Sequence, residues 1–188
     1  MMTAEQEQWA ITLLSKDKSF ARMTESDRRR IMSEAEKFGS HLAEKARAEL
    51  GVPQGSDSIR SMLETLGCVV RLDEKSGLPG PMSQYEEDLS AALFFTRRIR
   101  DTACKASEQC EWSSGWYDLF AQCLAKELFH HIEHTMSGKA SHHIRIQDRF
   151  LGLFPVSRPV EVAREIACLI FVKQFLDLPA IPGLISNA

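Results

Sequence analysis

The sequence predicts an α+β fold, in which a mostly helical domain carries a small, mostly antiparallel sheet and a long N-terminal helix. Three observations support this prediction. The 188 residues are 44% hydrophobic and 26% charged, which is typical of one globular domain with a single core. Several segments repeat apolar residues at helical spacing. Two short segments have the β-branched and aromatic character of buried strands.

A long amphipathic helix is expected over residues 27–50. Thr24 lies three residues before Asp27, an arrangement typical of a helix N-terminus. Apolar residues then recur every three or four positions until a Gly-Val-Pro stretch ends the pattern. We expect residues 1–55 to form a helical lead-in to one compact domain over residues 56–188.

The next segments indicate a helix, a turn and two strands. Serines and an aspartate can cap a short helix over residues 56–66, which Gly67 closes. A strand is expected over residues 68–72. A stretch rich in glycine and proline at residues 77–81 interrupts regular structure before a second strand at 91–96.

The second half of the chain predicts two further helices. A polar loop is expected over residues 101–113. Helical spacing then returns over residues 114–136, where a glycine ends it. The last helix is expected over residues 159–178, with Pro159 at its start and Pro179 after its end.

Charge and cysteine content narrow the possible functions. The formal net charge of -3 gives no support for direct nucleic-acid binding through bulk charge. The five cysteines are odd in number, never spaced C-x-x-C, and follow no apolar signal stretch. No apolar run approaches the roughly 20 residues of a membrane-spanning helix. We expect a cytoplasmic protein with reduced thiols and no membrane partner.

Acidic and histidine side chains share one side of the predicted helix over residues 114–136. On a helical wheel, Glu127, His130 and His134 fall within a wedge of about 60°, opposite the apolar side. Side chains three or four residues apart can converge on one point, and zinc binds neutral imidazole and carboxylate. The wedge is therefore a candidate zinc site. The alternative is a polar helix face that happens to contain histidines.

The remaining clustered histidines are expected to have no role in this site. His142 and His143 follow a glycine and are interpreted as exposed loop residues. His131 lies about 60° outside the wedge, toward the apolar side of the helix.

The stretch AKELFHHIEH at residues 125–134 resembles the motif helix of ImmA/IrrE-type zinc metallopeptidase-like proteins, which reads A-H-E-L-x-H. A second stretch, from Glu165 to the Leu-Pro pair ending at Pro179, is similar to the family's later glutamate motif. The resemblance covers about residues 30–182. It implies a zincin-like fold, zinc as cofactor, and hydrolysis of a protein partner such as a transcriptional regulator.

The resemblance implies a role for each matching residue. His130 and Glu165 correspond to metal ligands, and Glu127 corresponds to the general base that activates metal-bound water. Lys126 stands where the family has its first histidine ligand. A protonated amine has no lone pair to donate, and deprotonating lysine at pH 7 costs roughly 4.6 kcal/mol. We therefore expect a degenerate metal site, in which the ammonium pairs with Glu127 and Glu165.

Two arrangements could restore a metal site. Residues 130–134 have the H-x-x-E-H order of the inverted zinc peptidases, with His130 and His134 as ligands and Glu133 as base. In the other arrangement, either Cys123 or His134 joins His130 and Glu165 in a site shifted along the helix.

Three functions therefore stay open. The first is a zinc metallopeptidase that cleaves a regulatory protein. The second is a catalytically inactive pseudo-peptidase that binds a protein or peptide partner without cleaving it. The third is a helical interaction module in which residues 27–50 contact the partner.

Overall fold

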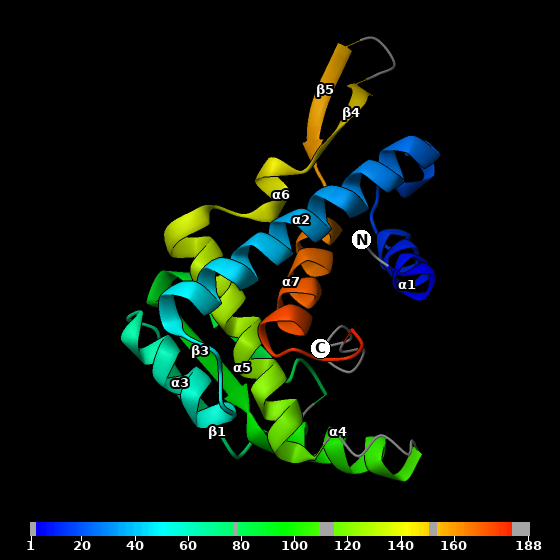
Figure 1. Cartoon of the computed structure of the whole chain (residues 1–188). Coiled ribbons are helices and arrows are strands. Elements are labelled where there is room, and N and C mark those ends of the chain that lie inside the picture. The colour runs from blue at the N-terminus through cyan, green and yellow to red at the C-terminus, as the bar shows by residue number, and fades with distance from the viewer. Residues whose placement is uncertain (1–2, 77–78, 110–114, 151–153, 182–188) are drawn as a thin grey trace.

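The computed structural model describes residues 3–76, 79–109, 115–150 and 154–181 (Figure 1). The helices are α1 (Ala4–Leu14), α2 (Glu25–Leu50), α3 (Ser56–Thr65), α4 (Thr96–Gln109), α5 (Trp116–Ile132), α6 (Ala140–His143) and α7 (Glu161–Phe175). Shorter turns are η1 (Phe20–Arg22), η2 (Glu87–Leu89) and the π-helical η3 (Glu133–Ser137). The strands are β1 (Val69–Asp73), β2 (Ser83–Glu86), β3 (Ala91–Phe95), β4 (Arg145–Phe150) and β5 (Phe154–Pro159).

Within the described part of the chain, no helix is long and apolar enough to span a bilayer.

The predicted α+β class, with helices around a small and mostly antiparallel sheet, is confirmed. One sheet has the order β1-β3-β2, with β1 parallel and β2 antiparallel to β3. Strands β4 and β5 form a separate antiparallel hairpin. This hairpin projects beside the N-terminal part of α2 (Figure 1), where Arg30 Nη2 donates a hydrogen bond of 2.7 Å to the Arg145 carbonyl.

The long helix α2 packs along α7. The two backbones are so close at Gly39 that a Cβ atom there would lie 2.3 Å from the Ala167 carbonyl oxygen. Farther along, Arg47 Nη1 donates to the Gln174 carbonyl at 3.1 Å. The apolar residues of α2 belong to the same core as those of α5 and α7. In the predicted interaction module, residues 27–50 would contact a partner. The apolar face of this helix is instead covered by α7 of the same chain.

The main predicted helices and both predicted strands are confirmed, with boundary differences of a few residues. The loop predicted over residues 101–113 is wrong up to Gln109, because α4 continues there; residues 110–113 lie outside the described part. Burial of Ile99 and Ala103, one turn apart, is enough to hold this otherwise polar helix against the core. Strand β2 was not predicted, because its sequence Ser-Gln-Tyr-Glu lacks apolar alternation.

Candidate functional site

Helix α5 carries the histidine motif through the middle of the molecule (Figure 1). Its apolar side packs against α7, where the Phe129 and Phe171 rings lie 5.5 Å apart. Its other neighbours include β2, from which Ser83 Oγ donates a hydrogen bond of 2.5 Å to Glu127 Oε1. Core packing and β2 together therefore fix the orientation of the motif helix.

Lys126 and Glu127 form an ion pair at the predicted metal position. The Lys126 Nζ atom lies 3.7 Å from Glu127 Oε1, and the Glu127 side chain is only 1% exposed. The other carboxylate oxygen, Oε2, is buried without a hydrogen-bond partner among the described residues. The predicted pairing of Lys126 with Glu127 is confirmed, whereas its predicted pairing with Glu165 is wrong, since the described residues hold no ion pair between these two side chains. An ammonium therefore compensates a carboxylate that is otherwise closed off from solvent.

A cleft of about 260 Å³ opens between α5 and α7. Its walls bring together Lys126 and His130 from α5 with Glu165 from α7, as the motif resemblance implies. The complete lining is Lys126, His130, Glu161, Arg164, Glu165, Cys168 and Leu169. Glu161 and Arg164 were not predicted, although Glu161 lies four residues before Glu165 and so shares a face of the last predicted helix.

Glu165 is a half-buried carboxylate with no hydrogen bond or ion pair within the described residues. Burial raises the pKa of Glu165, and the charges of Lys16 and Lys126 oppose this shift only in part. Lys16 lies just after α1, so the N-terminal segment contributes to the electrostatics of the cleft. No local pattern predicts this contribution, since more than 140 residues separate Lys16 from Glu165.

Glu133 is fully buried behind the cleft lining and binds Arg164 and the backbone of Ala140. It stands where α5 passes into the π-helical turn η3, and its Oε2 accepts from Arg164 Nε at 2.6 Å. Its Oε1 accepts from the Ala140 backbone N–H at 2.7 Å, and His130 Nδ1 lies 3.5 Å from Oε2. Burial alone would raise the pKa of Glu133, but these hydrogen bonds and the Arg164 charge lower it. Glu133 thus holds Arg164 at the cleft wall.

His134 and His131 lie outside the cleft. His134 Nδ1 is 3.9 Å from Glu87 Oε2, and Lys139 Nζ lies 2.7 Å from the other oxygen of this carboxylate, Oε1. His131 is buried, as its position toward the apolar side predicts. Its Nε2 lies 3.1 Å from the Leu66 carbonyl, and its Nδ1 lies 2.8 Å from Tyr85 Oη. Because a carbonyl only accepts, Nε2 donates there, and His131 joins α5 to the end of α3 and to β2.

Zinc does not fit the residues that line this cleft. The described part of the chain holds no group of three or more histidine, cysteine, aspartate or glutamate side chains placed to bind one metal ion. Lys126, which lines the cleft together with His130 and Glu165, carries an ammonium that cannot coordinate a metal ion. Cys123, which the sequence offers as a further ligand, is fully buried and does not belong to the lining of the cleft.

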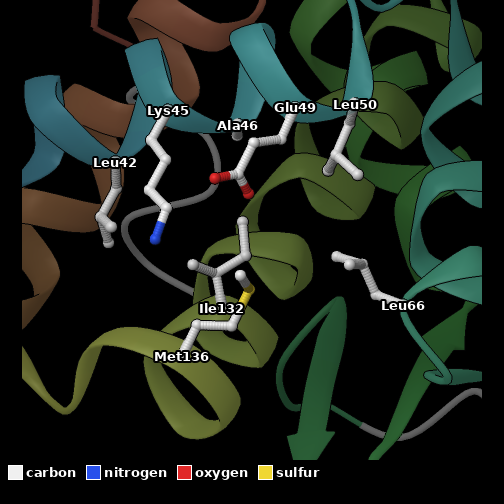
Figure 2. Close-up of a pocket in the computed structure, with 8 residues that line it drawn as sticks. All are labelled: Leu42, Lys45, Ala46, Glu49, Leu50, Leu66, Ile132 and Met136. Carbon is white, nitrogen blue, oxygen red and sulfur yellow. The ribbon is translucent and has the colours of Figure 1, made fainter.

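A second hollow, between α2 and the end of α5, is not a ligand site (Figure 2). It measures about 10 Å³, which is room for about one water molecule. Lys45 and Glu49 frame a lining that is otherwise apolar, and Ile132 and Met136 close it from the side of α5 and η3.

No protein-family model, curated protein or solved structure matches this chain. The resemblance to the ImmA/IrrE-type family therefore depends on the motif residues themselves.

Replacing Glu165 by glutamine is expected to raise the free energy of unfolding at pH 7 by about 0.5–1 kcal/mol, because it removes a desolvated charge. The folded-state pKa of Glu165 is raised, so its contribution to stability is full below the unfolded-state pKa and is lost as the pH rises through the folded value. The gain should therefore be small at pH 4. Urea denaturation at both pH values measures it.

The exposed Glu161→Gln variant serves as the matched control, because it removes the same charge from the same helix. It should change stability by no more than about 0.5 kcal/mol. A gain from Glu165→Gln that is larger at pH 4 than at pH 7 would contradict this interpretation.

Proposed function

We propose that this protein is a metallopeptidase-related binding protein with a zincin-like fold and a degenerate metal site. In this proposal a protein or peptide segment binds in the cleft between α5 and α7 and is not hydrolysed. The observation that carries the proposal is the Lys126–Glu127 ion pair, with 3.7 Å between Nζ and Oε1.

The ion pair disfavours hydrolysis for two chemical reasons. Metallopeptidases use a bound metal to bring the pKa of water toward about 7, and an ammonium offers no such coordination. A general base must also reach the proton that it abstracts. Glu127 is buried, accepts a hydrogen bond from Ser83 and is paired with Lys126. The family's water-activating residue therefore has a structural role in this chain.

The cleft itself supports binding. Its volume of about 260 Å³ accommodates one or two side chains of a peptide. Its lining combines charged groups with Leu169 and the buried Cys168, so a bound peptide can make both polar and apolar contacts. The motif resemblance suggests a regulatory protein, such as a transcriptional regulator, as the partner.

Metal analysis tests this proposal. After expression in medium supplemented with zinc, iron and manganese, we expect less than about a tenth of an equivalent of each metal in the purified protein. Close to one equivalent of metal, together with cleavage of a partner that Glu127→Gln abolishes, would establish the metallopeptidase instead.

A further inference from the structure

We propose that the occupant of the cleft presents a basic side chain, lysine or arginine, to the carboxylates of Glu165 and Glu161 on α7. This inference rests on the proposed function, because it takes the cleft between α5 and α7 as the binding site.

The cations of the cleft are already engaged by other carboxylates. Arg164 Nε donates to Glu133 at 2.6 Å, and its Nη2 lies 3.6 Å from Glu87 Oε1. Lys126 is paired with Glu127. These carboxylates stand behind or beside the cleft wall, since none of the three belongs to its lining. An acidic ligand would therefore have to compete for both cations.

In contrast to these cations, the two carboxylates of the cleft lining are unpaired within the described residues. Within the described residues, neither Glu161 nor Glu165 has an ion pair or a hydrogen bond to its side chain. They are four residues apart on α7, so their carboxylates lie on one face of the helix. Two neighbouring acceptor groups suit an ammonium or a guanidinium, whose N–H donors can reach both.

The chain itself already places a basic side chain near this position. Lys16 comes close enough to Glu165 for its charge to act against the burial that raises the pKa of Glu165. Lys16 is exposed, and no ion pair to its ammonium is found within the described residues. The charge of a lysine on a separate segment thus acts on Glu165. A basic side chain of a partner would interact with the same carboxylate against the like charge of Lys16.

Peptide titration of the full chain, followed by two-dimensional NMR, tests the inference. The probes are three acetylated and amidated tripeptides, Gly-Arg-Gly, Gly-Gln-Gly and Gly-Glu-Gly. We expect the arginine peptide to bind most tightly and to shift the amide signals of α5 and α7. Glu165→Gln should weaken its binding about tenfold, as for the loss of a charge-assisted hydrogen bond. Lys16→Gln should strengthen it about twofold to threefold, since it removes a competing surface charge.

Lys18→Gln is the matched control for Lys16→Gln, because it removes an equally exposed charge two residues away and should leave the affinity unchanged. The inference is overturned if the arginine peptide does not bind at tens of millimolar. It is equally overturned if the glutamine or glutamate peptide binds as tightly, or if Lys16→Gln weakens binding. Metal analysis of the same samples separates the two proposals. A metal-free protein without arginine preference refutes this inference alone, whereas one equivalent of zinc refutes the proposed function.

Discussion

Replacement of Glu133 by alanine is expected to lower the free energy of unfolding at pH 7 by about 3–5 kcal/mol. The Glu133 side chain is fully buried and accepts from Arg164 Nε and from the Ala140 backbone N–H. Alanine would leave a partly buried guanidinium without its nearest acceptor and a buried N–H without a partner. Urea denaturation followed by circular dichroism measures the loss.

The pH dependence of this loss has a definite sign. Hydrogen bonds and the Arg164 charge lower the folded-state pKa of Glu133, so its stabilisation is present above the unfolded-state pKa and disappears as the pH falls through the folded value. The difference between wild type and Glu133→Ala should therefore shrink in acid. Glu44→Ala, at an exposed site in α2, is the control and should stay within about 0.5 kcal/mol of wild type. A loss below about 1 kcal/mol for Glu133→Ala would contradict the structural role of this residue.

The second large effect is expected from Lys126→Met, which should lower the free energy of unfolding at pH 7 by about 2–4 kcal/mol. Methionine keeps the length of the side chain but leaves the buried Glu127 carboxylate without its cation. Urea denaturation at pH 7 measures the loss.

A second substitution shows whether the effect comes from charge. Glu127→Gln in the Lys126→Met background removes the unpaired carboxylate and keeps an oxygen that can accept from Ser83. The double variant should recover most of the lost stability, with a coupling of about 2 kcal/mol. If the double variant is as unstable as Lys126→Met, the lysine contributes through packing alone and the ion pair has no energetic importance.

The sequence was informative where one segment determines its own conformation. The helices α2, α5 and α7 follow from apolar spacing, and α2 begins in addition with a capping box formed by Thr24 and Asp27. The polar helix α4 was missed, because Ile99 and Ala103 are the only buried apolar residues among its described side chains, and two are too few to produce a clear period. The hairpin of β4 and β5 was missed as well, since pairing between neighbouring strands depends on tertiary contacts.

In the candidate site, too, local patterns predicted some residues, and tertiary contacts determined the others. The motif resemblance joined Lys126, His130 and Glu165 across about 40 residues of sequence, and the structure brings them to one cleft. Helical spacing alone placed His134 in the same group, but the π-helical turn that starts at Glu133 changes the spacing there. His134 then faces Glu87 from another part of the chain, a contact that no local pattern could reveal.

The most direct test of the central claim is a calorimetric titration of zinc into wild type and Lys126→His in parallel, both first freed of metal. We expect no saturable binding by wild type and binding of about one equivalent by Lys126→His, since a neutral imidazole can coordinate with His130 and Glu165. Lys18→His, at an exposed site, controls for an added histidine and should behave as wild type. Tight binding of one equivalent by wild type, or no gain from Lys126→His, would contradict the claim that the Lys126 ammonium takes the place of the metal.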